Sequence, residues 1–335
     1  MFATQTALAL RTACASAHRI LLTGPVYPDG DSIGACLALA QGIRACWPNV
    51  IVDVVGDIAF RYAWMPGADA ILKDESLQTT TPYDLAIVLD GDRSRLVPTV
   101  AAAFDAAQTK AIIDHHSSTS PQGYDIALID HYAASTCEMI HALMQPWGVS
   151  LDRSLAALLY TGLIFDTGGF CHSNTTAETH RFAATLLETG FSHTPVHIQI
   201  LEERRPAGLK LLGHVLQNAT FHANGEVVFG VVEHSISQSL DCEHGDIEGI
   251  VDALVFTRGA ELACLCVEKG PDLVKLSLRS RTHLDVAQLA RSLSPGGGGH
   301  PRAAGVMLTT PLAQLRQTLP AVLVSAVRGE TPESG

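Results

Sequence analysis

Aspartates at the ends of apolar segments restrict the fold of this chain more than any other feature of its sequence. Asp29 and Asp31 lie between the first apolar segment and the first helical pattern. Asp90 follows Leu-Ala-Ile-Val-Leu, Asp114 follows Ala-Ile-Ile, and Asp166 follows Thr-Gly-Leu-Ile-Phe. Short apolar strands that alternate with amphipathic helices are typical of βα units and a parallel sheet. Because such sheets bind ligands at the carboxyl ends of their strands, we expect these acids to meet at one sheet edge.

The same alternation gives the elements expected in the first half of the chain. Strands are predicted at Arg19–Thr23, Ile51–Val55, Asp84–Leu89 and Ala111–Ile113. Helices are predicted at Ser32–Cys46, Ser135–Met144, Leu155–Ile164 and Ala177–Glu188. These elements predict an N-terminal α/β domain built on a parallel sheet.

The second half has a different pattern. Residues that alternate between apolar and polar predict strands at Phe221–Val232, Glu261–Glu268 and Val274–Arg281, and a helix follows at Asp285–Ser292. A chain of 335 residues with 47% hydrophobic content can bury two cores. We therefore expect an N-terminal domain at 1–190, a linker at 191–206 and a smaller α/β domain at 207–328, with the active site in the cleft between the domains.

Charge and cysteine content narrow the classes of partner. The net charge of −12 argues against affinity for long nucleic acid, which requires lysine and arginine to neutralise phosphates. The eight cysteines form no C-x-x-C pair, so reduced thiols and a cytoplasmic location are expected. No apolar run reaches the length of a membrane span, and no membrane partner is expected.

The acids and the neighbouring histidines suit a metal site. His115 and His116 follow Asp114 directly, so that imidazoles join the carboxylates. Clustered carboxylates repel one another and their pKa values rise, a penalty that a divalent cation removes. Carboxylate and imidazole ligands without a thiolate suit Mn²⁺ or Mg²⁺ and can also hold Zn²⁺ or Co²⁺. Bound metal ions activate water and orient phosphate esters, so the residues predict phosphate-ester hydrolysis.

Two features of the second half suit an anionic substrate. In Val274–Arg281 the strand alternation places Lys275, Arg279 and Arg281 on one face. The run Gly296–Gly299 would let backbone amides approach a phosphate closely.

Each part of this pattern also has a simple structural interpretation. The Asp29–Asp31 segment can form a turn in which its last residue or Ser32 caps the following helix. Asp90 alone is typical of a loop cap, a basic strand face can be an ordinary solvated surface, and Gly296–Gly299 can be a flexible linker. The occurrence of all the acidic strings in one chain, each at the end of an element, favours the functional interpretation.

Together these strings resemble the four motifs of the DHH phosphoesterase superfamily. The matching strings are Asp29-Gly30-Asp31-Ser32-Ile33-Gly34, the Asp90 segment, Asp114-His115-His116 and Asp166-Thr167-Gly168. In the second half, Gly296-Gly297-Gly298-Gly299-His300 with Ala303-Ala304-Gly305 resembles the signature of the DHH-associated C-terminal domain. The two-domain layout is similar to that of the bacterial nanoRNase and pAp phosphatase group. Those enzymes are described as degrading very short oligoribonucleotides and removing phosphate from 3′-phosphoadenosine 5′-phosphate (pAp).

The resemblance implies a role for each matching residue. Asp90 would bridge two Mn²⁺ ions, with Mg²⁺ or Co²⁺ as alternatives. Asp29 would serve the first metal ion, and Asp31, His115 and Asp166 would complete the second site. His116 and Asp114 would be catalytic, and His116 would contact the scissile phosphate or protonate the leaving group. Substrate contacts are expected from Ser135, Thr136, Arg279, Gly297, Gly298, Gly299 and His300.

One position departs from the family pattern. The first motif of the family normally opens with a histidine four residues before its first aspartate, and this chain has Pro25 there. Proline cannot ligate a metal. The first metal site is therefore expected to be weaker, or to be completed by a residue such as Tyr27 or by water.

The resemblance implies hydrolysis of short oligoribonucleotides and of pAp as the expected function. The expected partner is a short RNA, a dinucleotide or a mononucleotide rather than a long duplex, and a homodimer is left open. One alternative is a phosphodiesterase of dinucleotide signals such as pApA or c-di-AMP. Another is a nucleotide-binding protein with a degraded metal site, for which Pro25 is the only support.

Overall fold

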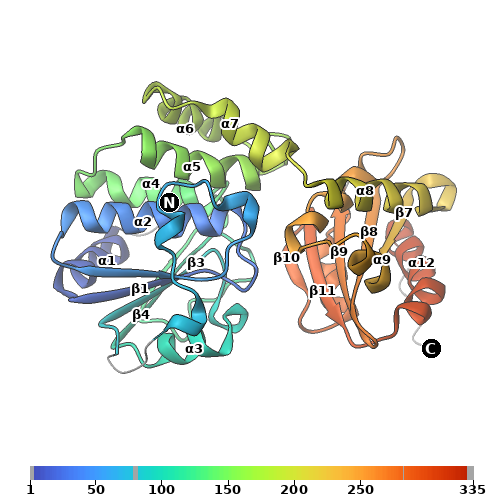
Figure 1. Ribbon diagram of the computed structural model, residues 1–335, viewed down its shortest axis with the longest axis horizontal. Helices are drawn as coiled ribbons and strands as arrows, with labels where there is room; N and C mark the ends of the chain where they lie inside the picture. Colours follow the sequence, from blue (N-terminus) through green and yellow to red (C-terminus); the bar gives the residue numbers. More distant parts are fainter. Residues whose placement is uncertain (1–3, 78–81, 282, 330–335) are drawn as a thin grey trace. The chain divides into compact units, whose positions relative to one another are not determined.

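The computed structural model describes residues 4–77, 82–281 and 283–329. The chain divides into two compact units, whose boundary in the sequence lies between Glu203 and Arg204 (Figure 1). This boundary falls inside the segment 191–206, which contains the short helix α7 (His193–His197) and a π-helical turn at Ile198–Glu202. Each unit has its own sheet and its own hydrophobic core.

The first unit contains a five-stranded parallel sheet with strand order β2-β1-β3-β4-β5. Its strands are β1 (Arg19–Thr23), β2 (Ile51–Val55), β3 (Leu85–Leu89), β4 (Thr109–Asp114) and β5 (Ile126–Ile129). The chain order differs from the spatial order only at β2, which lies outside β1. Because these five strands are parallel, they all end at the same edge of the sheet, as the sequence predicted.

Helices cover both faces of this sheet. Figure 1 shows α2, α4 and α5 on one face and α3 on the other. The helices of this unit before α7 are α1 (Thr4–Ser16), α2 (Gly30–Cys46), α3 (Pro98–Asp105), α4 (Thr136–Met144), α5 (Arg153–Asp166) and α6 (Ala177–Glu188). The central strand β3 is buried along its whole length, which explains its uninterrupted apolar sequence.

The second unit contains a six-stranded mixed sheet with strand order β10-β11-β9-β8-β7-β6. Only β7 and β8 run parallel. The strands are β6 (Thr220–His222), β7 (Val227–Val232), β8 (Leu262–Gly270), β9 (Leu273–Ser280), β10 (Gly298–His300) and β11 (Ala303–Leu308). The helices are α8 (Pro206–Asn218), α9 (His234–Ser239), α10 (Ile250–Val255), α11 (Val286–Leu293) and α12 (Leu312–Arg328). Two apolar clusters fill the opposite faces of the sheet.

One predicted strand is wrong. The segment Phe221–Val232 is not continuous, because a 3₁₀ turn at Ala223–Gly225 separates β6 from β7. Asn224 in this turn has φ 56°, a left-handed conformation that Asn and Gly adopt most readily. The Asn224-Gly225 pair therefore makes an antiparallel hairpin where the apolar pattern indicated a single strand.

Candidate metal centre

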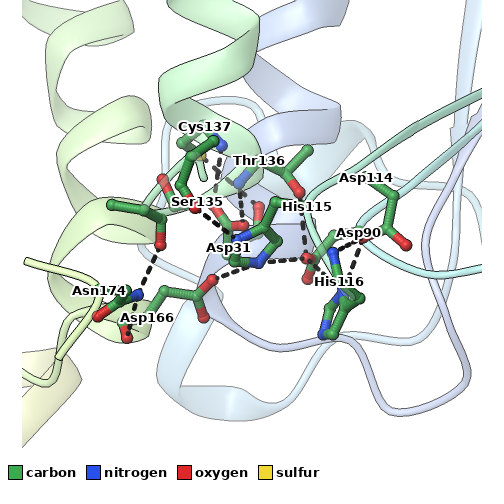
Figure 2. Close-up of polar contacts among 12 residues, drawn as sticks. Asp31, Asp90, Asp114, His115, His116, Ser135, Thr136, Cys137, Asp166 and Asn174 are labelled. Carbon is green, nitrogen blue, oxygen red and sulfur yellow. Dashed lines mark hydrogen bonds and ion pairs between the residues drawn. The ribbon is translucent and has the colours of Figure 1, made fainter. Parts of the chain in front are cut away.

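Four predicted ligands from distant parts of the sequence meet in the first unit. The ligand atoms of Asp31, Asp90, His115 and Asp166 all lie within 4.8 Å of one another (Figure 2). Asp31 comes from the first turn of α2, Asp90 follows β3, His115 follows β4, and Asp166 is the last residue of α5. The convergence that the sequence predicted is therefore present, although Asp166 is carried by a helix rather than by a strand.

Two helix N-termini hold Asp31. Helix α2 begins at Gly30, two residues earlier than predicted. Asp29 is its N-cap, and Oδ1 of Asp29 accepts hydrogen bonds from the amides of Asp31 at 3.0 Å and Ser32 at 3.1 Å. The cap is thus Asp29 rather than Asp31 or Ser32. The Asp31 carboxylate in turn accepts hydrogen bonds from the amides of Thr136 at 2.6 Å and Cys137 at 3.0 Å, at the start of α4. Those amides and the helix dipole favour the ionised carboxylate.

Asp90 lies between two supports. Its amide donates to the carbonyl of Ile113 at 3.0 Å, which continues the pairing of β3 with β4. Its Oδ1 accepts a hydrogen bond from Thr136 Oγ1 at 3.1 Å. The residue has φ 57°, in the left-handed region that Asp and Asn tolerate better than most residues. Asp90 is therefore held by backbone and side-chain contacts together.

The ring of His115 has one defined orientation. Its Nδ1 lies 3.1 Å from the carbonyl of Ala133, and because a carbonyl only accepts, Nδ1 carries the hydrogen. Nε2 then points toward Asp166 Oδ2 at 2.8 Å and Asp90 Oδ1 at 3.6 Å. A backbone carbonyl that fixes the ring in this way is the usual support of a metal-binding histidine.

The charges of these residues suit a divalent cation. Burial, together with the Asp166 carboxylate, raises the pKa of Asp31 to about 7. Burial and the Asp31 carboxylate raise the pKa of Asp90 to about 7 as well. Burial alone would lower the pKa of His115, but the Asp166, Asp90 and Asp31 carboxylates raise it well above its ordinary value. A cation of charge +2 would replace the protons that otherwise neutralise this buried cluster, and the donor set fits Mn²⁺ or Mg²⁺ with one imidazole.

His116 lies beside the four-residue cluster. Its Nδ1 bonds to Asp114 Oδ1 at 2.7 Å, and the side chain of His116 is 18% exposed, against 2% for His115. Burial alone would lower the pKa of His116, but the hydrogen bond to Asp114 and the Asp90 carboxylate raise it. Burial alone would raise the pKa of Asp114, but hydrogen bonds from His116 and Thr119 lower it to about 2. Asp114 thus orients His116, which is the more exposed histidine of the pair.

A second ligand group overlaps the first. The ligand atoms of Asp90, Asp114 and His116 also lie within 4.8 Å of one another. Asp90 belongs to both groups, and its role as a bridging ligand stays a prediction. Asp29, which was expected to serve the first metal ion, lies outside the four-residue cluster, and the contacts described for it above are those of a helix cap. Its role as a ligand stays a prediction.

Ser135 and Thr136 have structural contacts at the start of α4. Both are fully buried. Ser135 is the N-cap and its Oγ accepts a hydrogen bond from the Glu138 amide at 3.1 Å, while Thr136 donates to Asp90. Substrate contact by either hydroxyl stays a prediction. The observed contact of Thr136 supports the Asp90 carboxylate, and that of Ser135 caps α4.

The predicted substrate residues of the second unit lie in its sheet, apart from Gly297, which precedes β10. Arg279 on β9 donates through Nε to Asp252 on α10 at 2.7 Å. Gly298 and His300 form β10 with Gly299 between them, and Gly299 has φ 134°. A Cβ on Gly297 would lie 2.2 Å from the carbonyl oxygen of Ala290. Close packing against α11 and β11 therefore accounts for part of the glycine run, and substrate binding by these residues stays a prediction.

Comparisons with known proteins decide the family. The model of the DHH family N-terminal domain matches residues 19–163, and the model of the DHHA1 domain matches residues 224–325. The bifunctional oligoribonuclease and PAP phosphatase NrnA of Thermus thermophilus is 30% identical over 324 residues, which cover 93% of this chain and 92% of that relative.

This chain belongs to the DHH family. Another relative, the bifunctional oligoribonuclease and PAP phosphatase NrnA of Bacillus subtilis, is 28% identical over 86% of this chain and 89% of its own length. The crystal structure of an exopolyphosphatase-related protein from Bacteroides fragilis has the same fold, with a TM-score of 0.84 at 23% identity, over 98% of this chain and 96% of that chain. Among the helices of the described residues, none is long and apolar enough to cross a membrane.

Pro25 occupies the position that a DHH motif gives to histidine. The residue is buried, and a Cβ added to Gly91, the residue after Asp90, would lie 3.5 Å from the Pro25 ring. Position 25 therefore lies next to the Asp90 segment. In this DHH protein an apolar ring takes that place.

Titration with Mn²⁺ should therefore show one tight site per chain in isothermal calorimetry. The four-residue cluster supplies that site, whereas Pro25 supplies no ligand to a second one. The variant Pro25→His restores the family residue and should add a second site. Two tight sites of equal affinity in the unmodified protein would contradict the expectation.

Proposed function

We propose that this chain is a metal-dependent phosphoesterase that hydrolyses short oligoribonucleotides and releases phosphate from pAp. The observation that carries the proposal is the cluster of Asp31, Asp90, His115 and Asp166, which would hold the cation, with Mn²⁺ as the first choice. The names of the relatives from T. thermophilus and B. subtilis support the substrate class. Both relatives match over most of their own length, so the proposal concerns the whole chain.

The cation and the protein residues would divide the work of hydrolysis. When bound, a divalent cation supplies Lewis acidity that activates water and neutralises charge on the phosphate. Thr136 and the amides at the start of α4 hold Asp90 and Asp31 in place before any substrate arrives. This preorganisation matters because phosphoryl transfer depends on positioning and charge neutralisation more than on a protein nucleophile.

His116 would act on the leaving group. Asp114 fixes Nδ1, and although burial alone would lower the pKa of His116, the hydrogen bond to Asp114 and the Asp90 carboxylate raise it, which favours the protonated ring. Nε2 can then donate its proton to the departing oxygen, which is general acid catalysis. In the second unit, His300 and Arg279 are proposed to contact the nucleotide.

A side-by-side assay tests the substrate class. Purified protein with Mn²⁺ is incubated with dinucleotide, trinucleotide and longer RNAs, duplex RNA, pAp and cyclic dinucleotides. We expect the highest kcat/KM on the shortest RNAs, release of phosphate from pAp, and little hydrolysis of duplex RNA. Faster hydrolysis of long RNA than of dinucleotides would contradict the proposal.

The same assay also tests the alternative function, hydrolysis of dinucleotide signals. The cyclic-di-AMP phosphodiesterase GdpP of Geobacillus thermodenitrificans is 24% identical over 90% of this chain, but the match covers only 46% of that relative. A preference for c-di-AMP or pApA over dinucleotides of other sequence would favour this rival. Binding of nucleotides without hydrolysis of any of them would favour the other alternative, a nucleotide-binding protein with a degraded metal site, which Pro25 supports.

A further inference from the structure

Asn174 connects two segments of the metal centre that are far apart in the sequence. Its Nδ2 donates a hydrogen bond to the carbonyl of Ala134 at 2.9 Å and another to the carbonyl of Asp166 at 3.2 Å (Figure 2). The residue follows Asp166 by eight positions, outside the strings that resemble the family. Nothing in the sequence pattern marked it as part of the site.

Both of these carbonyls belong to backbone that supports a metal ligand. Asp166 ends helix α5 and contributes its own carboxylate to the cluster. Ala134 follows Ala133, whose carbonyl fixes Nδ1 of the His115 ring. One amide group therefore links the backbone under Asp166 to the backbone that orients His115, and these two ligands face each other at 2.8 Å.

The chemistry of the two partners fixes the orientation of the Asn174 side chain. Carbonyl oxygens only accept hydrogen bonds, so the NH₂ group must face them. The Oδ1 atom is buried and accepts no hydrogen bond from the residues that the structure describes. The two hydrogen bonds that Asn174 Nδ2 donates therefore explain why an amide side chain occupies this position.

We propose that Asn174 is a positioning residue of the metal centre, which fixes the Asp166 carboxylate relative to His115 Nε2. The inference rests on the proposed function, because it assumes that Asp166 and His115 share a cation. Groups behind metal ligands commonly contribute 10- to 100-fold to metal affinity, about the size of effect expected here.

A simpler role for Asn174 is to cap the end of helix α5. The last carbonyls of a helix lack partners within it, and Asp166 is the final residue of α5. His172 provides a matched control for this role, because its Nδ1 also bonds to the Asp166 carbonyl, at 2.9 Å. His172 is exposed, and the contact to the Ala134 carbonyl belongs to Asn174.

Calorimetric titration with Mn²⁺ distinguishes the two roles. Asn174→Ala removes both donors, and Asn174→Asp does so at nearly constant volume if the alanine variant packs poorly. We expect the dissociation constant of Mn²⁺ to rise about 10- to 100-fold and kcat to fall, with KM for a dinucleotide changing less than about threefold. His172→Ala should change the Mn²⁺ affinity less than about threefold, because the link between the two segments remains.

Equal Mn²⁺ affinity in the wild type and both Asn174 variants would overturn the proposal, even if the variants unfold at lower temperature. Equal weakening by His172→Ala would also overturn it, since loss of the cap alone would then explain the effect. Failure of the proposed function would look different. In that case the wild type would bind Mn²⁺ but hydrolyse no nucleotide, or would bind no Mn²⁺ at all.

Discussion

Asp90→Asn is expected to lower kcat/KM on a dinucleotide at least about 10³-fold. A bound cation supplies several kcal/mol of transition-state stabilisation, and about 1.4 kcal/mol corresponds to a factor of ten in rate. Asparagine suits this test, since it tolerates the left-handed backbone of residue 90 and can still accept the hydrogen bond from Thr136. Only the charge of the Asp90 side chain is lost. Steady-state kinetics with Mn²⁺ measures the effect.

The stability of the same variant provides the control. Removing one carboxylate from a buried acidic cluster relieves repulsion, so without metal the unfolding temperature should stay the same or rise. Asp105→Asn is the matched substitution, because Asp105 forms an exposed ion pair with Arg93 away from the cluster. It should leave kcat/KM unchanged. Retention of more than about a tenth of the wild-type kcat/KM in Asp90→Asn would contradict the proposal that Asp90 binds the cation, because loss of a metal ligand should cost several kcal/mol.

Gly162→Ala is expected to disrupt the metal centre although residue 162 ligates nothing. A Cβ at this position would lie 2.2 Å from Asp31 Oδ1 and 2.4 Å from Cys137 Sγ, which is closer than such atoms approach in proteins. Alanine favours a helix over glycine by about 1 kcal/mol, but crowding a packed core typically costs about 1–3 kcal/mol or more. The clash should therefore prevail, displace Asp31 from the amides of α4 and weaken Mn²⁺ binding more than about tenfold.

Gly213→Ala is the control for helix propensity. Gly213 lies within α8, and a Cβ added there would meet no atom within 4 Å. This substitution should be neutral or slightly stabilising, with unchanged Mn²⁺ affinity. Calorimetric titration measures the Mn²⁺ affinity of both variants, and thermal unfolding measures their stability. Wild-type Mn²⁺ affinity in Gly162→Ala would show that the contact with Asp31 has no functional consequence.

Local pattern was sufficient to predict many of the strands and helices of the first unit. Strands β1 and β2 and helix α6 have the predicted bounds, and β3 begins one residue later than predicted. The apolar runs that are buried in a parallel sheet are distinctive, and an acid directly after such a run is easily recognised. The convergence of Asp31, Asp90 and His115 followed from the rule that parallel strands end at one edge, whereas Asp166 reaches the cluster from the end of helix α5.

Contacts between segments that are distant in the sequence could not be predicted from local pattern. Gly162 is close to Asp31 only because α2, α4 and α5 pack together, and no periodicity in the sequence encodes that distance. The importance of Asn174 depends on two backbone carbonyls whose positions only the folded chain defines. Helix α12 was not predicted and contains Pro320, a residue that normally interrupts a helix, while tertiary packing of Leu315, Leu319 and Leu323 stabilises it.

A crystal grown with Mn²⁺ and measured at the manganese absorption edge tests the central claim most directly. We expect an anomalous peak that is coordinated by Asp31, Asp90, His115 and Asp166, and the peak should disappear in Asp90→Asn. A manganese ion bound elsewhere, with none of these four side chains in contact with it, would contradict the proposed metal centre.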